Sequence, residues 1–431
     1  MSQASTRAEA EGLIRYIDAA PTPYHACAEA ARLLGEAGFT EVEESASWSA
    51  SGRHYTVRGG SLIAWAVPER VTTTATFRLV GAHTDSPNLR IRPDPDATTL
   101  GYRQLRVEVY GGPLLNSWMD RDLGLAGRVA VAGPQGPQVR LLHVARPLLR
   151  IPQLAPHLDP TMRTEGLRLN AQVEIFPIWG LDGTSVATFP AFLAEELTVD
   201  SDRVLSWDVM AYDLAPSAIS GAAGEFVSAP RLDNLGSAYC AIRAISELAR
   251  AERKGTQIAV ICLFDHEEVG SVSASGAAGA MLPQVLERVF LALGGGREEF
   301  LRALAGSVSV SADMAHAVNP NYPDRSDPGH LVHLNQGPAI KFSSRQRYAT
   351  GAPGAATFVA ACQASGTPYQ RYVNRGDVPG GSTIGPLTAA WLGVETVDVG
   401  IPALAMHSIR ELCGADDPGH LVRALGAFLE L

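Results

Sequence analysis

Two adjacent glutamates stand where a buried strand is expected to end. The segment Asp265-His266-Glu267-Glu268 directly follows an unbroken apolar run from Ile258 to Phe264. Such a run predicts a parallel strand that is covered on both faces. Neighbouring carboxylates raise each other's pKa, which is costly unless a cation or a proton-transfer role occupies the position. The segment therefore favours a metal site or acid–base chemistry at the end of a sheet.

Other metal-suited side chains also follow predicted strands. They are His83 after residues 77–81, Asp313 after residues 308–310 and His407 a few residues past 397–401. Open α/β sheets bind ligands in the crevice beyond the carboxyl ends of their strands. We therefore expect these side chains to meet at one edge of a sheet.

Imidazole nitrogens and carboxylate oxygens are ligands that suit zinc or a similar divalent ion. A further carboxylate, Asp233 at the start of a predicted helix, could bridge two such ions. The predicted ligands are His83, Asp233, Glu268, Asp313 and His407.

Two acids receive other roles. Glu267 would point away from Glu268 if the chain is extended there, so we expect Glu267 to accept a proton from water and pass it to a leaving amine. Asp85 lies two residues past His83 and could hydrogen-bond the far side of that imidazole, fixing its orientation.

Each motif taken alone has a structural interpretation. A His-x-Asp pair is often a turn or a surface pair, and Glu-Glu is usually solvated. Asp233-Asn234 is also typical of a helix cap. The prediction of a two-metal centre depends on all of these residues following strand or cap signals in one framework.

Composition narrows the class of partner. The chain has 431 residues, 46% of them hydrophobic, and a formal net charge of −10 without any basic run. Nucleic acid and anionic membranes are therefore poor partners, whereas small molecules and peptides fit. Five scattered cysteines form no CxxC pair, which argues against a thiolate metal cluster. The amino terminus lacks a signal-peptide core and no apolar window is long enough to span a bilayer, so a cytoplasmic location is expected.

The order of elements predicts an interrupted domain. Short alternating segments dominate between His83 and Asp233, whereas α/β alternation prevails from Arg231 onward. If His83 and the later carboxylates share one site, the α/β domain is discontinuous, with residues 1–89 and 229–431 forming it and residues 90–228 forming a β-rich insertion.

Several motifs, in order, resemble the aspartyl aminopeptidase family of metallopeptidases. They are the segments 81–87 (GAHTDSP), 116–123 (NSWMDRDL), 230–235 (PRLDNL), 264–271 (FDHEEVGS), 311–316 (SADMAH), 337–342 (GPAIKF) and 380–385 (GGSTIG). The resemblance covers nearly the whole chain. It implies a phosphorylase/hydrolase-like α/β zinc-peptidase domain that is interrupted by a β-rich dimerisation domain, and assembly of dimers into a tetrahedral homododecamer.

The resemblance also implies roles for particular residues. It places two zinc ions at the five predicted ligands, with Glu267 as general base and Asp85 as supporting acid. Its pocket lysine matches Lys341, one of only two lysines beside 33 arginines, with His316 nearby. A solvent-exposed lysine at a strand edge is the alternative for Lys341.

Two further substrate contacts follow from the same likeness. His157 resembles a family histidine that reaches a neighbouring subunit's active site, although a structural histidine is a comparable interpretation. Gly380 and Gly381 alone indicate a turn, but in a closed site they would let the backbone approach the substrate. His266 stands where parts of the family have asparagine, which affects local hydrogen bonding rather than the chemistry.

The predicted function is an aminopeptidase with two divalent metal ions, expected to be zinc, that releases amino-terminal residues, preferentially Asp or Glu, from peptides. An N-acyl amino acid deacylase with the same metal site is one alternative. A metal-stabilised scaffold without turnover is another, and the presence of Glu267 argues against it because a scaffold needs ligands but no base.

Overall fold

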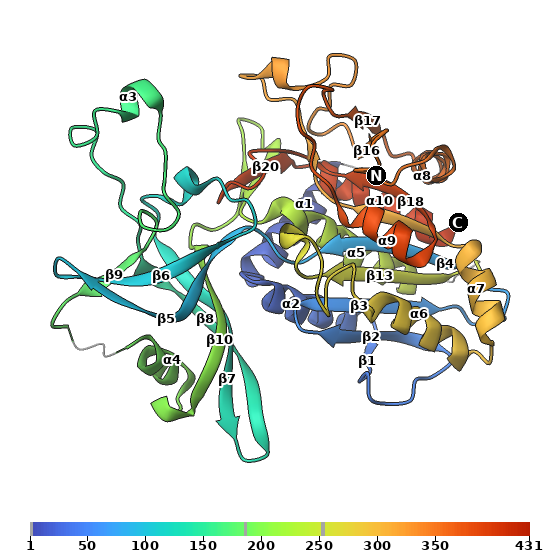
Figure 1. The fold of residues 1–431 in the computed structure, drawn as a ribbon. Helices are drawn as coiled ribbons and strands as arrows, with labels where there is room; N and C mark the ends of the chain where they lie inside the picture. The colour runs from blue at the N-terminus through green and yellow to red at the C-terminus, as the bar shows by residue number, and fades with distance from the viewer. Residues whose placement is uncertain (1–2, 185–187, 251–254) are drawn as a thin grey trace. The chain divides into compact units, whose positions relative to one another are not determined.

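The computed structural model describes residues 3–184, 188–250 and 255–431 (Figure 1). The chain divides into two compact units. Unit 1 comprises Met1–Asp85, Ser217–Met406 and Glu411–Leu431, and unit 2 comprises Ser86–Pro216 and His407–Arg410. The dimerisation role expected for the insertion stays a prediction.

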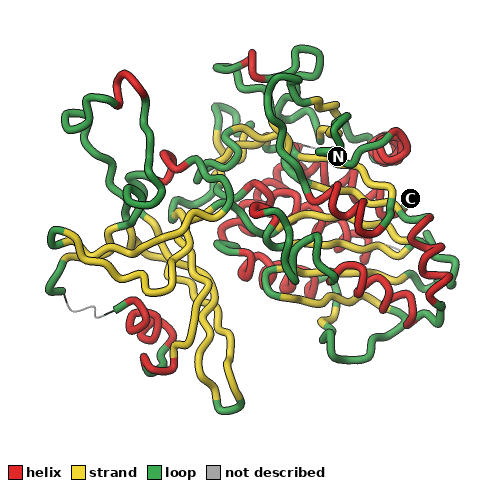
Figure 2. Tube along the Cα trace, viewed as in Figure 1, coloured by secondary structure: helices red, strands yellow, loops and turns green. Residues whose placement is uncertain are grey.

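Unit 1 is built on a mixed sheet of nine strands, shown in yellow in Figure 2. In spatial order these are β1 (Thr40–Glu41), β2 (Gly52–Arg58), β3 (Ser61–Val67), β13 (Ile258–Phe264), β4 (Phe77–His83), β14 (Val308–Ala312), β18 (Glu395–Gly400), β16 (Ala339–Phe342) and β17 (Gln370–Val373). The central strands β13, β4, β14 and β18 are mutually parallel. The four strands expected before the candidate ligands are therefore confirmed as one parallel block.

Helices cover both faces of this sheet. One face packs against α1 (Gln3–Ala19), α2 (Pro23–Glu36), α5 (Leu232–Arg250), α8 (Ala352–Ala364) and α10 (Asp417–Glu430). The other packs against α6 (Met281–Ala292), α7 (Arg297–Ala305) and α9 (Ile384–Leu392). This double cover explains why all seven residues of β13 are buried and apolar.

Smaller elements complete unit 1. A five-stranded sheet contains β11 (Ala218–Ser220), β12 (Phe226–Ala229), β20 (Glu411–Gly414), β19 (Pro402–Leu404) and β15 (Ala315–His316). Two 3-10 turns, η3 (Glu267–Val269) and η4 (Pro323–Arg325), follow β13 and β15. The turn η3 carries the paired glutamates.

Unit 2 has its own antiparallel sheet and core. The spatial order is β8 (Gly136–Leu149), β7 (Leu123–Gly133), β10 (Val204–Asp213), β5 (Asn88–Thr99), β6 (Tyr102–Tyr110) and β9 (Ile178–Leu181). Its helices are α3 (Met162–Glu165) and α4 (Phe189–Leu197), with 3-10 turns η1 (Leu115–Trp118) and η2 (Ser201–Arg203). Phe189 packs between the rings of Phe192, Trp179 and Trp207, which anchors α4 to this sheet.

The fold is thus mixed α/β, with a central mixed sheet and a separate antiparallel sheet. Among the residues that the structure describes, no helix is both long and apolar enough to cross a bilayer.

Candidate metal and catalytic site

Three neighbouring strands deliver the predicted site residues of unit 1 to one edge of its large sheet. His83 ends β4, Asp313 follows β14, and the η3 glutamates follow β13. The register pairs His83 with Phe264, and the Thr84 amide then donates to the Phe264 carbonyl at 2.8 Å. Parallel strands end at a common edge, so residues far apart in sequence meet there.

The His83 imidazole is the centre of the cluster. Its Nε2 lies 3.3 Å from Oδ1 of Asp233, 3.7 Å from Oδ1 of Asp313 and 3.9 Å from Oε2 of Glu267. Ligand atoms lie within 4.8 Å of one another in the set His83, Asp233 and Asp313 and again in the set His83, Glu267 and Glu268. Both sets contain imidazole nitrogen and carboxylate oxygen, the donors that zinc accepts.

The electrostatics of the cluster favour a bound cation. Burial by itself lowers the pKa of His83, but the carboxylates of Asp233, Asp313 and Asp85 outweigh it and hold that pKa well above its usual value. Burial also raises the pKa of Glu267 to about 7, and the acids Asp313 and Asp233 add to that rise, whereas His83 opposes it. Buried acids that pull a proton onto their own histidine form a site that stabilises positive charge.

Asp85 contacts both His83 and the turn that carries the two glutamates. It is fully buried, and its two carboxylate oxygens accept the amide N–H groups of Glu267 and Glu268, each at 3.1 Å. Its backbone carbonyl lies 3.0 Å from Nδ1 of His83, and its carboxylate lies 3.4 Å from the same nitrogen. Asp85 therefore fixes the glutamate turn as well as the imidazole.

The expectation of an extended chain at Glu267 is wrong. His266 has φ of 67°, and Glu267 to Val269 form the turn η3. The chain turns because the two amides of Glu267 and Glu268 are drawn to Asp85, and because His266 Nδ1 lies 2.9 Å from Oγ of Ser273. The turn brings ligand atoms of both glutamates within 4.8 Å of each other and of His83, so strand alternation does not separate their roles.

Two supporting contacts of Asp233 are not evident in the sequence. The buried Glu411 of β20 accepts the Asp233 amide at 2.9 Å, and Asn234 Nδ2 donates to the Ala312 carbonyl at 2.8 Å. Asp233 and Asn234 belong to α5, but their backbone angles are not helical and the peptide bond between them is cis. Such angles at the start of a helix are compatible with the expected cap, which stays a prediction. No motif spacing points to Glu411.

Lys341 is buried in the sheet, with 2% of its surface exposed. It lies on β16, between β17 and β18, so the alternative of an exposed strand-edge lysine is wrong. Its Nζ donates to the carbonyls of Asp313 at 2.9 Å and Met314 at 3.1 Å and lies 5.1 Å from the centre of the Tyr348 ring. This lysine holds the strand end that carries Asp313.

The other predicted substrate residues occupy separate places. His316 is exposed on β15 and lines a cavity of about 280 Å³, and Gly380 and Gly381 line a second cavity of about 500 Å³. His157 is exposed on a turn of unit 2. His407 also belongs to unit 2, where its Nδ1 lies 3.0 Å from the carbonyl of Gly112.

A sheet edge bearing this cluster defines a metallohydrolase of α/β architecture. The model of the family described as aminopeptidase I zinc metalloprotease (M18) matches residues 16–429. The chain therefore belongs to the M18 family of zinc metallo-aminopeptidases, which hydrolyse peptide bonds. This assignment favours the aminopeptidase over the deacylase and scaffold alternatives.

Individual relatives agree in sequence and in fold. The probable M18 family aminopeptidase 2 of Streptomyces coelicolor is 48% identical over 426 residues, which is 98% of each chain. The protein of that description in Mycobacterium tuberculosis is 47% identical over 428 residues, again 98% of each chain.

Solved structures extend the comparison. A chain in the cryo-EM structure of the Ape4 and Nbr1 complex has a TM-score of 0.95 at 36% identity, covering 99% of this chain and 86% of that one. The S. cerevisiae mApe1 dodecamer has a TM-score of 0.84 at 27% identity, covering 97% and 95%. The M18 aminopeptidase of Thermotoga maritima, at 23% identity, shares the fold with a TM-score of 0.87.

Proposed function

We propose that this aminopeptidase works with two zinc ions and prefers peptides whose first residue is Asp or Glu. The observation that carries the metal centre is the cluster of His83 with the carboxylates of Asp233, Glu267, Glu268 and Asp313, three of which lie within 3.9 Å of its Nε2. A cluster of that charge is costly without cations.

The ligands would be His83, Asp233, Glu268 and Asp313 in unit 1. His407 of unit 2 is proposed as a fifth ligand because it follows the strand at residues 397–401 and because the family resemblance implies a ligand there. Zinc bound to such ligands polarises a carbonyl and lowers the pKa of water.

Glu267 is proposed as the general base. Its pKa near 7 suits a group that both accepts and returns a proton at neutral pH. The turn η3, held by Asp85, places Oε2 of Glu267 3.9 Å from Nε2 of His83. Glu267 would take the proton from the attacking water and deliver it to the amine that leaves.

We assign to Lys341 the recognition of an acidic first residue. Its ammonium group is the only lysine charge on β16, and a compact buried cation suits recognition of a carboxylate. Two of its three donor positions serve the carbonyls of Asp313 and Met314. The third could face the side chain of the first substrate residue. Lys341 would then recognise that residue and also hold the strand end that carries Asp313, a proposed metal ligand.

A substrate panel tests the proposal. Zinc-loaded protein should hydrolyse Asp-Ala and Glu-Ala with kcat/KM at least about tenfold above Leu-Ala and Lys-Ala, since a buried charge pair contributes about 1.5–3 kcal/mol. N-acetyl-Asp should not be hydrolysed. Equal rates on all four dipeptides would refute the acidic preference, and turnover of N-acetyl-Asp alone would favour the deacylase.

Assembly into a homododecamer is also proposed, because the similar mApe1 of S. cerevisiae was solved as a dodecamer. His157, exposed on its unit 2 turn, would then be available to a neighbouring subunit's site. Multi-angle light scattering of the purified protein tests this. A mass far below twelve chains at micromolar concentration would refute it.

A further inference from the structure

The cavity of about 500 Å³ in unit 1 is lined by an excess of positive charge. Its charged lining consists of Arg345, Arg347, Arg375 and a single acid, Asp377. The chain as a whole carries a net charge of −10, so this concentration of arginines runs against the average. A concave surface lined by arginine attracts anions, above all carboxylates and phosphates.

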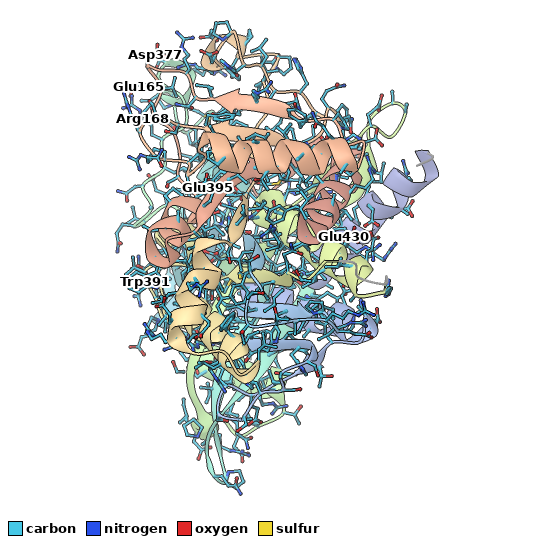
Figure 3. All side chains as sticks on the ribbon, turned by 90° about the vertical axis from the view of Figure 1, so that its right-hand side faces the viewer. Glu165, Arg168, Asp377, Trp391, Glu395 and Glu430 are labelled. Atoms are coloured by element: carbon cyan, nitrogen blue, oxygen red, sulfur yellow. The ribbon has the colours of Figure 1, made fainter. Side chains whose placement is uncertain are left out.

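Two of these arginines have side chains without a protein partner among the described residues. Arg375 is paired with Asp377, from Nε to Oδ1 at 2.6 Å, on the outer loop where Figure 3 labels Asp377. Within the described part of the chain, the guanidinium groups of Arg345 and Arg347 take part in no hydrogen bond or ion pair. Both fork-shaped donor sets are therefore available to a ligand in the cavity.

The walls that carry these side chains are fixed. Ser343 Oγ accepts the amides of Arg345 and Arg347, at 3.3 and 3.4 Å. Ser382 Oγ donates to the carbonyl of Arg347 at 3.3 Å. This bond ties the segment that contains Gly380 and Gly381 to the segment that carries the two arginines. Single exposed arginines are ordinary, but here two on one tied segment line the same cavity.

A buried carboxylate joins the segments that follow Tyr348 and Gly381. Asp398 of β18 accepts the Ala349 amide at 2.6 Å through Oδ2 and the Thr383 hydroxyl at 2.5 Å through Oδ1. A Cβ at Gly385 would lie 2.4 Å from Asp398 Oδ2, so glycine there allows this close approach. The loop that ends at Tyr348 and the loop that ends at Thr383 are thus held to one point of the sheet.

Tyr348 relates the cavity to the metal-ligand cluster. Its ring lines the cavity and lies 5.1 Å from Nζ of Lys341, which in turn donates to the carbonyl of Asp313. Lys341 and the metal-ligand cluster do not line the cavity themselves. The arginines therefore line a space that is separate from the groups proposed to hold the first residue of the peptide and is joined to them by Tyr348.

We propose that Arg345 and Arg347 form a second anion subsite, which binds a carboxylate of the peptide on the carboxyl-terminal side of the scissile bond. The inference rests on the proposed peptidase function. The carboxylate could be the terminal one of a short peptide or the side chain of an acidic residue after the first. The subsite would give short or acidic peptides a lower KM, without a change in the chemical step.

Two pairs of peptides show whether the bound carboxylate is the terminal one or that of an acidic side chain. The first pair is Asp-Ala-Ala with a free or an amidated carboxyl terminus, and the second is Asp-Glu-Ala-amide against Asp-Gln-Ala-amide. At least one carboxylate-bearing member should have a KM about tenfold below that of its neutral partner, the size expected for one charge-assisted hydrogen bond. Which pair responds identifies the source.

The matched variants are the double substitution Arg345→Gln with Arg347→Gln, and the control Arg371→Gln. Arg371 is exposed on β17 and lies outside the cavity lining. The double variant should raise the KM of the responding peptide about tenfold and leave kcat and the neutral peptide unchanged, whereas the control should change neither. Equal KM values within both wild-type pairs, or an unaltered preference in the double variant, would overturn the subsite.

Equilibrium binding keeps this test independent of turnover. Zinc-loaded Glu267→Gln protein is titrated with each peptide by calorimetry, with and without the two arginine substitutions. The charged peptide should bind about tenfold more tightly only when both arginines are present. If wild type cleaves no peptide, the proposed function fails, but this titration still supports or refutes the subsite.

Discussion

Replacing Asp85 by Asn tests whether one buried carboxylate organises the catalytic turn. Asp85 accepts two amides of η3, from Glu267 and Glu268, at 3.1 Å each. An asparagine keeps one acceptor and presents an NH₂ group to the other amide, so a buried donor loses its partner. A hydrogen bond to a charged group contributes about 1.5–3 kcal/mol, and the surviving bond weakens because its acceptor becomes neutral.

The summed effect is a loss of about 3 kcal/mol of unfolding free energy, because one charged bond is lost and one is weakened. In a domain of this size that corresponds to a fall of about 5 °C or more in the thermal midpoint. Turnover should also fall by about 10²-fold, since a displacement of about 1 Å of a catalytic group costs that much.

The assay is thermal unfolding by circular dichroism together with initial rates on one dipeptide, both with zinc present. Asp202→Asn serves as the control, because Asp202 is exposed on η2 of unit 2. If Asp85→Asn matched the control in both midpoint and turnover, the claim that Asp85 holds the glutamate turn would be refuted.

Three other perturbations have defined outcomes. Lys341→Met should lower unfolding free energy by about 2 kcal/mol or more in urea titrations, because it leaves the Asp313 and Met314 carbonyls without their buried donor. Chelation should lower the thermal midpoint and abolish turnover, and added zinc should restore both, because the acidic cluster then loses its cation. Burial raises the pKa of Glu9, but hydrogen bonds from Arg243 and Tyr239 outweigh that and hold it below its ordinary value of 4.5. Because the folded-state pKa is lowered, the ionised Glu9 carboxylate stabilises the fold at pH values above 4.5, and this stabilisation is lost as pH falls through the folded-state pKa. Glu9→Gln should therefore flatten the loss of stability below pH 4.5.

Each of these three predictions has a result that would contradict it. A Lys341→Met protein as stable as wild type would show that its two carbonyl contacts contribute nothing. A thermal midpoint that chelation leaves unchanged would contradict a cation in the buried cluster. If the unfolding free energy fell equally steeply at low pH in Glu9→Gln and in wild type, the pairing of Glu9 with Arg243 would contribute nothing to acid stability.

Part of the site was predictable because it follows strand ends. His83, Asp313 and the paired glutamates each come directly after an apolar run, and the parallel pairing of β4, β13 and β14 converts that sequence order into proximity. The interruption of the α/β pattern also indicated a second unit, since the segments from His83 to Asp233 alternate in short strands.

The remainder depends on contacts between distant residues that no local pattern encodes. Glu411 reaches the Asp233 amide across 178 positions of sequence, and Asp398 joins two loops through single hydrogen bonds. The turn at Glu267 was missed because strand alternation was extended past Phe264, where amide bonds to Asp85 instead bend the chain. The alternative of an exposed Lys341 stayed open because a four-residue strand gives no hint of its neighbours.

The most direct test of the central claim measures zinc content and turnover on the same Glu267→Gln sample. If Glu267 is the base and not an essential ligand, the variant should keep the zinc stoichiometry of wild type while kcat falls by about 10²–10⁴-fold, the usual size of general acid–base effects. Near-normal turnover with full zinc would contradict the assignment of the base. Loss of zinc together with turnover would instead make Glu267 a metal ligand, as its place in a ligand set with His83 and Glu268 allows.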